Sequence, residues 1–213
     1  MGEPGGRQVV TFYFDPGCPW TWMTSRWLVA AAEERALDIR WRTFSLGLLN
    51  QGRQLPASLD TPEHRAKAAL TARALRVTQA ARAQDDDDAA GRFYREWGVR
   101  FHETGREPTA ALLEEAAAAA GVTDLLRTAD TADLDAAVAD SLAEALRLAG
   151  PDVGSPVLHL AGSERGMFGP IVSPAPTGPA AGQLWDALVV LQGLESFYEL
   201  KRGRLGPPVF ASP

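Results

Sequence analysis

The hydrophobic and polar positions of the first 45 residues show two patterns, one typical of strands and one typical of a helix. Residues 8–14 form a short apolar run and residues 38–44 alternate polar and apolar side chains, so each segment predicts a strand. Between them, residues 18–36 place Trp27 and Ala31 at the spacing of one helix face. The start of the chain therefore predicts a strand, a helix and a second strand.

The middle of the chain predicts helices only. From about residue 61 to 149 there is no strand candidate, and Thr61 and Pro62 are residue types typical of an N-cap and a first helical position. Gly121 and Gly150 stand where glycine commonly ends a helix. The expected helices begin at residue 61, follow the acidic run 85–88, span 110–120 and span 130–149.

Two stretches between these elements are read as loops. Residues 46–62 carry several glycines and prolines, which favour irregular structure. The acidic run 85–88 is interpreted as a solvated loop that caps the next helix and complements its dipole, with a metal site as the alternative.

Strand patterns return at the end of the chain and define the fold class. Residues 156–160 and 166–169 predict two more strands, and a last helix is expected from residue 177 or 178 to about 202. The order is βαβ, a helical insertion and αββα, which predicts an α/β protein with a mixed sheet flanked by helices. The expected domains are 1–50 with 130–213, and the insertion 51–129.

Composition and charge narrow the class of protein. The chain has 213 residues, of which 46% are hydrophobic and 23% charged, as in ordinary soluble globules. Its net charge of −6 and pI near 5.1 argue against nucleic acid or an anionic membrane as a partner. No apolar run approaches roughly 18 residues. The first residues lack the features of a signal peptide, so a cytoplasmic location is expected.

The only cysteine of the chain follows the first predicted strand, in Asp15-Pro16-Gly17-Cys18-Pro19. A helix start offers unpaired backbone N–H groups and the positive end of the helix dipole, and both favour the reactive thiolate. Proline fits the first helical turn, where its missing N–H costs nothing. Cys18 is therefore the candidate nucleophile, and its thiol is expected to be more acidic than a free cysteine. The alternative is a buried, inert cysteine.

Thr21 and Trp20 are the candidates beside this cysteine. Thr21 lies one helical turn after Cys18, at the position where a dithiol enzyme carries its second cysteine. Its hydroxyl can hydrogen-bond a thiolate, which lowers the pKa of the thiol; ordinary helix packing is the alternative. Trp20 can form a flat wall for an aromatic substrate, or can simply pack in the core. With one cysteine, no internal disulfide can form.

Several motifs in this order resemble the DsbA-like branch of the thioredoxin superfamily. Within it, the chain is most similar to the actinobacterial mycothiol-dependent nitroreductases and disulfide reductases. The likeness covers roughly residues 8–210 and departs from the family's Cys-Pro-Trp-Cys at Thr21. It rests on FDPGCPW (14–20), WMTSRW (22–27), FSLGLLN (44–50), GSPV (154–157), FGPI (168–171) and LWDA (184–187).

The resemblance implies a thioredoxin-like fold with an all-helical insertion, and it adds candidate residues. Pro156 matches the cis-proline that faces the active-site cysteine, although an ordinary trans proline at a strand start is the alternative. The main chain of Ser155 is then expected to pair with an extended thiol substrate. Asn50 and His102 match positions that line the substrate pocket, with a turn asparagine as the alternative for Asn50. Pro19 and Trp20 complete the substrate-facing set.

The expected activity is that of a thiol–disulfide oxidoreductase with a single catalytic cysteine. A mixed disulfide on Cys18 is resolved by a low-molecular-weight thiol, which the resemblance implies is mycothiol, acting as a co-substrate. No tightly bound cofactor is expected, and His64, His102 and His159 lack metal-ligand spacing. The partners are a small-molecule thiol and a disulfide or electrophilic substrate, and the protein is expected to be a monomer or homodimer.

Two other functions stay open from the sequence. A thiol transferase or isomerase resembling the kappa-class glutathione transferases would hold the cofactor thiolate at Cys18 or Thr21 without a covalent adduct. A non-catalytic relative would bind a ligand without turnover, and the missing second cysteine favours it. Mass spectrometry of a trapped adduct separates the first alternative from the oxidoreductase, and the reactivity of the thiol against pH separates the second.

Overall fold

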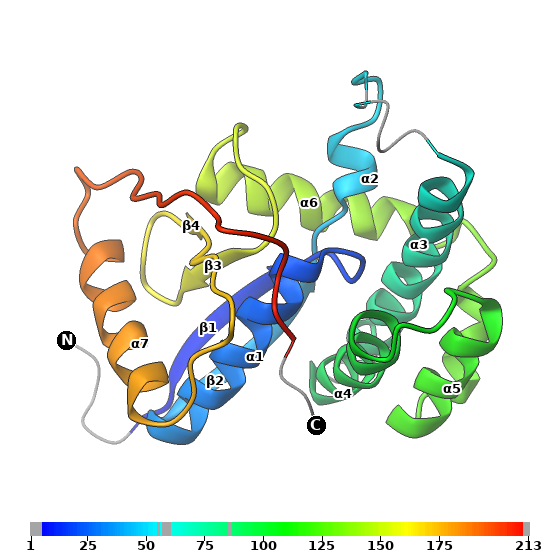
Figure 1. Ribbon diagram of the computed structural model, residues 1–213, viewed down its shortest axis with the longest axis horizontal. Helices are drawn as coiled ribbons and strands as arrows, with labels where there is room; N and C mark the ends of the chain where they lie inside the picture. Colours follow the sequence, from blue (N-terminus) through cyan, green and yellow to red (C-terminus); the bar gives the residue numbers. More distant parts are fainter. Residues whose placement is uncertain (1–5, 55, 57–60, 85–86, 211–213) are drawn as a thin grey trace.

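The computed structural model describes residues 6–54, 56, 61–84 and 87–210 (Figure 1). The strands are β1 (Gln8–Phe14), β2 (Leu37–Thr43), β3 (Val157–Leu160) and β4 (Met167–Phe168). The α-helices are α1 (Pro19–Glu34), α2 (Leu46–Leu49), α3 (Pro62–Arg82), α4 (Asp87–Gly98), α5 (Ala110–Ala120), α6 (Asp135–Ala149) and α7 (Pro179–Gln192). Two shorter helical segments are the π-helical η1 (Val99–Glu103) and the 3₁₀ η2 (Thr123–Thr128).

The four strands form one mixed sheet in the order β2-β1-β3-β4. β1 and β2 are parallel, with Phe12 opposite Trp41, whereas β1 and β3 are antiparallel, with Phe12 opposite Leu158. β3 and β4 are also antiparallel. The sequence prediction of a mixed sheet with flanking helices is confirmed. Since β1 is central, its carboxyl end places the following loop in the middle of the molecule.

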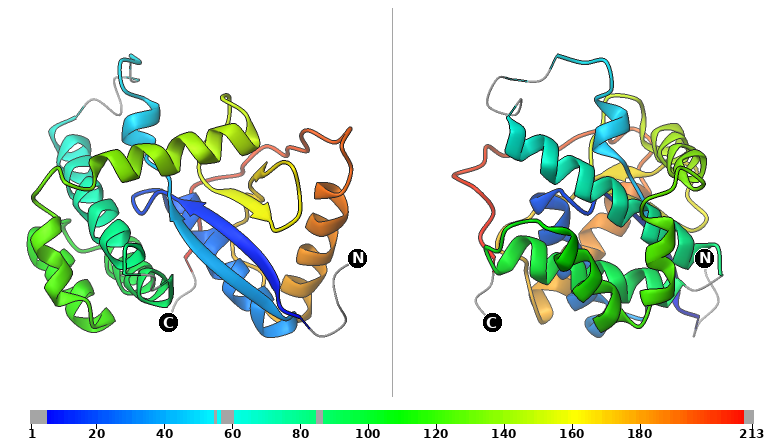
Figure 2. Two further views of the ribbon diagram at one scale, coloured as in Figure 1. Left: turned by 180° about the vertical axis from the view of Figure 1, so that it is seen from behind. Right: turned by 90° about the vertical axis from the view of Figure 1, so that its right-hand side faces the viewer.

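Alternating side chains on β1 divide the core into two layers. Val10, Phe12 and Phe14 belong to the larger apolar cluster, which includes α1, α7 and the helices of the insertion. Tyr13 points to the opposite face and packs with Leu142 and other residues of α6. Figure 1 shows α1 and α7 on one face, and the rear view in Figure 2 shows α6 crossing the other face near the end of β1.

The core is rich in fully buried tryptophan, and each indole N–H finds an acceptor. Trp27 of α1 donates to the Ala181 carbonyl of α7 at 3.1 Å, which ties the two helices on the same face together. Trp185 of α7 donates to the Gln8 side chain at 3.1 Å, at the start of β1. Buried tryptophans supply large apolar area and need such partners for their one polar atom.

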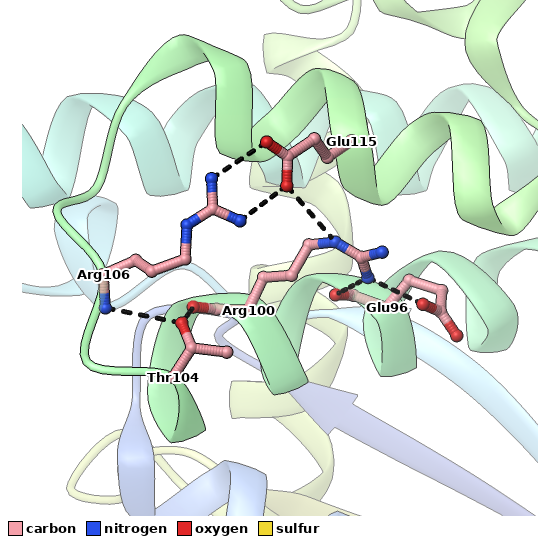
Figure 3. Close-up of polar contacts among 5 residues, drawn as sticks. All are labelled: Glu96, Arg100, Thr104, Arg106 and Glu115. Carbon is pink, nitrogen blue, oxygen red and sulfur yellow. Dashed lines mark hydrogen bonds and ion pairs between the residues drawn. The ribbon is translucent and has the colours of Figure 1, made fainter.

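The helices between β2 and α6 form a bundle beside the sheet. α4 packs against both α3 and α5. An exposed ion network joins η1 and the following loop to α5 (Figure 3): Arg106 makes two hydrogen bonds to Glu115, at 2.6 and 2.9 Å, and Arg100 lies 3.8 Å from the same carboxylate. Arg100 also contacts Glu96 at 2.7 Å, one turn earlier on α4. Because the pair of Arg106 with Glu115 is exposed, it contributes little to the stability of the fold.

Several element boundaries differ from the sequence prediction. The helix expected from residue 130 begins at Asp135, whose two carboxylate oxygens accept hydrogen bonds from Arg76 of α3. Residues 123–128 form the additional segment η2. The expected loop after residue 45 contains α2, because the Ser45 side chain accepts the Leu48 N–H and caps a helical turn. The last helix ends at Gln192 rather than about 202, since Gly193 follows it.

Two of the predicted helix ends are confirmed, and the prediction for the acidic run is tested only in part. Thr61 caps α3 by accepting the His64 N–H at 3.1 Å, and Gly121 ends α5 with a positive φ of 74°. The acidic run lies partly outside the described residues, at 85 and 86, while Asp87 and Asp88 belong to the first turn of α4. The helix that follows continues through the π-helical η1, which carries Phe101 and His102.

A candidate thiol site around Cys18

Cys18 is the N-cap of α1 and lies half-buried at the carboxyl end of β1. Its backbone is extended, with φ −86° and ψ 114°, and its own N–H donates to the Asp15 carbonyl at 3.1 Å. The Cys18 carbonyl accepts the first helical N–H, from Trp22, at 3.0 Å. The turn and the helix start therefore hold the sulfur at the position that the sequence predicts.

The thiol is less acidic than the helix start alone predicts. Burial raises the pKa of Cys18 above its ordinary value, and the negative charge of Asp15 raises it further. The Thr21 hydroxyl, the Thr21 N–H and the Trp20 N–H lower the pKa as hydrogen-bond donors to sulfur, but burial outweighs them. The sequence prediction of a depressed pKa is therefore wrong in direction, because desolvation of the charged form was not visible in the motif.

Thr21 takes part in a chain of hydroxyl groups beneath the cysteine. Thr21 is fully buried, and its Oγ1 lies 2.8 Å from Oγ of Ser155. Oγ of Ser155 in turn accepts the backbone N–H of Asp15 at 2.9 Å. These hydrogen bonds connect the turn formed by residues 15–18 with the first turn of α1 and the segment before β3. They bring together two sequence candidates that lie 134 residues apart.

Asp15 is a buried carboxylate that the sequence interpretation did not single out. Its Oδ1 accepts the Gly17 N–H at 2.8 Å and its Oδ2 accepts the Leu46 N–H at 2.7 Å. Burial raises the pKa of Asp15 to about 6, although these backbone donors and that of Cys18 lower it. Asp15 thus joins the turn 15–18 to the start of α2. An aspartate before proline reads as a turn residue, so the sequence carried no signal of its burial.

Two residues of α4 and η1 contact the turn 15–18 through the carbonyl of Pro16. Nε1 of Trp97 donates to this oxygen at 2.9 Å, and Nε2 of His102 lies 3.0 Å from it. Since a carbonyl only accepts, His102 carries its proton on Nε2. Burial lowers the pKa of His102 to about 4, so the ring is neutral at pH 7. Thr71 of α3 also packs here, because a side chain on Gly17 would meet its Oγ1 at 2.5 Å.

The C-terminal segment passes beside the start of α1 (Figure 1) and contacts Trp20. The Arg204 guanidinium lies 4.4 Å from the centre of the Trp20 ring, a cation–π contact. Farther along, the ring of Phe210 stacks with His102 at 6.2 Å. Val209 donates its N–H to Oγ of Ser173 at 2.7 Å. The tail thus forms one rim of the site, which the sequence did not reveal because the segment has no periodic pattern.

The remaining sequence candidates are placed as follows. The Ser155–Pro156 bond is cis, and Ser155 is brought to α1 by its contact with Thr21. Pro19 is the first residue of α1. Asn50 ends α2 as its C-cap, where its N–H donates to the Leu46 carbonyl at 3.0 Å. The binding roles given to these residues stay predictions.

The other two histidines lie in separate elements, His159 in β3 and His64 in α3. His159 lies next to the Ser163 carbonyl at 2.8 Å, and His64 belongs to the first turn of α3. Within residues 6–54, 56, 61–84 and 87–210, no group of three or more metal-ligating side chains is found. Of the helices that the structure describes, none has the length and apolar character to span a membrane.

Comparison with known proteins places the chain in a family. The model of the family described as Rv2466c-like, the mycothiol-dependent nitroreductase Rv2466c, matches residues 17–202. A relative among curated proteins is the uncharacterized protein Rv2286c of Mycobacterium tuberculosis. It is 30% identical over 203 residues, which is 91% of this chain and 81% of the relative.

Solved structures share the fold at lower identity. The probable DsbA oxidoreductase SCO1869 of Streptomyces coelicolor superposes with a TM-score of 0.58 at 20% identity, covering 97% of this chain and 100% of that one. The cytosolic disulfide reductase DsbM of Pseudomonas aeruginosa gives a TM-score of 0.54 at 21% identity, covering 85% and 99%. These likenesses confirm a DsbA-like thioredoxin fold with its added helices.

Proposed function

Because the chain belongs to the Rv2466c-like family of mycothiol-dependent nitroreductases, we propose that it is a thiol–disulfide oxidoreductase in which Cys18 is the only protein nucleophile. The observation that carries the proposal is the placement of Cys18 at the start of α1, with Thr21 and Ser155 directly beneath it. The position of a second cysteine is filled by Thr21, so a thiol from solution completes the cycle. Mycothiol is the proposed co-substrate, and the cytoplasm the proposed location.

The proposed reaction exchanges one disulfide for another. The Cys18 thiolate attacks one sulfur of a substrate disulfide, forms a mixed disulfide and expels the other half as a thiolate, which takes up a proton. A molecule of mycothiol, deprotonated, then attacks the substrate sulfur of the mixed disulfide. This step releases a disulfide between mycothiol and the substrate and regenerates the Cys18 thiolate. The electrons come from the mycothiol thiol, so neither a metal nor a nucleotide takes part.

The hydroxyl chain is the proposed device for stabilising the thiolate. Ser155 accepts a hydrogen bond from the Asp15 N–H, which leaves the Ser155 proton to point at Thr21. When Ser155 donates, the Thr21 proton is directed toward the sulfur of Cys18, where the Thr21 hydroxyl lowers the pKa. Each bond in such a chain polarises the next. Thr21 is thus a hydrogen-bond donor to the sulfur, and Ser155 is a positioning residue that acts through it.

The rim of the site is proposed to receive the non-sulfur part of the substrate. Trp20 is half-buried and directly follows Pro19 at the helix start, and Arg204 covers one face of its ring. A planar substrate group that stacks on Trp20 therefore meets the C-terminal segment as well. Asn50 and His102 stay the proposed pocket residues, although the Nε2 proton of His102 is already bonded to the Pro16 carbonyl.

The direct test is the intact mass of the protein after incubation with oxidised mycothiol. The natural chain is expected to gain one mycothiol adduct, because the thiolate of Cys18 attacks the disulfide. Cys18→Ser is expected to gain none and to lose turnover. Thr21→Cys is expected to lose two hydrogens without an adduct, because an internal disulfide replaces the mixed one.

Two results would reject this proposal. If the natural chain forms no adduct while Cys18→Ser keeps full activity, the thiol is not the nucleophile and a transferase mechanism takes its place. If neither adduct nor turnover is found with any thiol, the chain is a binding relative without exchange activity. Fresh reductant must restore the original mass, which separates a mixed disulfide from irreversible oxidation.

A further inference from the structure

A cationic cleft lies away from Cys18, between the second half of α1 and α4. Its volume is about 410 Å³, and its lining includes Arg26 and Val29 of α1, Trp41 of β2, and Arg92 and Arg95 of α4. Arg26 follows Cys18 by eight residues on α1, a rise of roughly 12 Å along the helix axis. The cleft is thus a separate place from the thiol site.

The sequence of α4 keeps this cleft open. Asp88, Gly91, Arg92 and Arg95 follow the spacing of one helix face, and all four line the cleft. A side chain at Gly91 would meet Nε1 of Trp41 at 2.4 Å. Because Gly91 has none, α4 comes close to the Trp41 indole, and Arg92 and Arg95 line the cleft beside it. Among the lining residues that the structure describes, Asp88 is the only acidic one, and it is one turn before Arg92.

Arg26 has no carboxylate ion-pair partner among the residues that the structure describes. Its guanidinium lies 4.0 Å from the centre of the Trp22 ring, and its Nε contacts Oγ of Ser25 at a long 3.3 Å. Glu103 attracts it from farther away, but one oxygen of Glu103 already accepts the Trp22 indole N–H at 2.9 Å. A half-buried guanidinium without a paired anion is costly to desolvate.

The charge of Arg95 acts on Arg26 from the other wall. The pKa of Arg26 is lowered to about 10, chiefly by burial and in smaller part by repulsion from Arg95, although Tyr94 and Glu103 act to raise it. Arg95 is mostly exposed and has one weak contact, at 3.4 Å, to Glu96, which has a closer partner in Arg100 at 2.7 Å. Two like charges therefore face one cavity from two helices.

We propose that this cleft is a binding site for a small organic oxyanion, held between the guanidinium groups of Arg26 and Arg95. A phosphate monoester or a carboxylate presents two oxygens at the spacing of an arginine fork. Val29 and the edge of Trp41 give the cleft an apolar wall, so an anion with a flat apolar group fits better than a bare ion. The anion would remove the repulsion between the two arginines and neutralise the buried charge.

The test uses phenyl phosphate, inorganic phosphate and phenol as probes in isothermal titration calorimetry of the full chain at low salt. Phenyl phosphate is expected to bind most tightly, inorganic phosphate more weakly and phenol not detectably. Arg95→Gln is expected to weaken the binding of phenyl phosphate by about tenfold or more, the effect of removing one charged hydrogen-bond donor. Arg26→Lys, which keeps the charge but loses the fork, is expected to weaken it as well.

Arg127→Gln is the matched control, because Arg127 lies on η2, is not among the residues that line the cleft, and donates to the nearby Asp124 carbonyl. This variant is expected to bind phenyl phosphate like the natural chain. Equal loss of binding in the control would show a non-specific charge effect and overturn the proposal. The proposal also fails if phenol binds as well as phenyl phosphate, if no probe binds, or if Arg95→Gln binds unchanged. Benzoate separates the two oxyanion types, since its binding shows that a carboxylate suffices.

Discussion

The helix start and the burial of Cys18 shift the pKa of its thiol in opposite directions. The helix start directs the N–H groups of Trp20 and Thr21 at the sulfur, as the motif predicts, and both lower the pKa of the thiol. Burial and the carboxylate of Asp15 raise the pKa by more. The motif identifies the hydrogen-bond donors that follow the cysteine along the chain. It does not show how deeply the rest of the fold buries the sulfur.

The first prediction follows from this balance. The rate of alkylation of Cys18 by iodoacetamide should rise with pH to a midpoint above the ordinary thiol value of about 8.5. Asp15→Asn should move the midpoint to lower pH, because it removes a negative charge that opposes the thiolate. A midpoint below the ordinary value in the natural chain would show that the helix start outweighs burial.

Thr21 and Ser155 carry the second prediction. Thr21→Val keeps the volume but removes the hydroxyl donor, so the alkylation midpoint of Cys18 should rise by about one to two units. Ser155→Ala should raise the midpoint by less, because Ser155 acts through Thr21. In the double variant, the shift should equal that of Thr21→Val alone. Additive shifts would show that the two hydroxyls act separately and that no chain connects them.

Among the elements, local patterns predicted the sheet better than the helix ends. β1 was placed at residues 8–14 and α5 at 110–120, because a strand pattern and a glycine cap are short-range signals. η2 and the late start of α6 could not be predicted, since the bonds between Arg76 and Asp135 depend on the packing of two distant helices. The domain boundaries at residues 51 and 129 stay a prediction, and α3 contacts both β2 and α6.

The same contrast applies to the site. Cys18, Thr21 and Ser155 were found because a motif or a resemblance marked them, and they do lie together. The bonds that hold the turn in place were not found, because their donors come from the helices of the insertion. Trp97 and His102 bind the Pro16 carbonyl from 81 and 86 residues away.

The third prediction tests whether the hydrogen bond from Trp97 of α4 orients the turn 15–18. Trp97→Phe removes one N–H from the Pro16 carbonyl and should change the alkylation rate of Cys18 and speed amide hydrogen exchange at Gly17 and Cys18. Trp185→Phe is the matched control, because it also loses one indole hydrogen bond but at the far end of β1. It should change neither rate. If both variants act alike on Cys18, general loosening of the core explains the effect.

For the molecule as a whole, the buried side chains of Asp15 and His102 give opposite pH dependences of the free energy of unfolding. The pKa of Asp15 is raised to about 6, so its contribution is fully present below about pH 4 and is lost as pH rises through 6. The pKa of His102 is lowered to about 4, so its contribution is present above about pH 6.5 and is lost as pH falls. Each amounts to about 3 kcal/mol, and the two nearly cancel between these limits.

The fourth prediction separates these contributions by substitution. In Asp15→Asn, the free energy of unfolding should rise with pH between about 4 and 6.5, because only His102 is left to titrate. In His102→Gln, which keeps an N–H donor for the Pro16 carbonyl, it should fall over the same range. Urea unfolding followed by tryptophan fluorescence at several pH values measures both slopes. Exposed ion pairs such as Arg106 with Glu115 are common to both variants, so the difference between the slopes isolates the buried pair. A slope near zero in Asp15→Asn would mean that His102 is solvated in the folded protein, and a slope near zero in His102→Gln would mean the same of Asp15. Equal slopes in the two variants would mean that neither pKa is shifted.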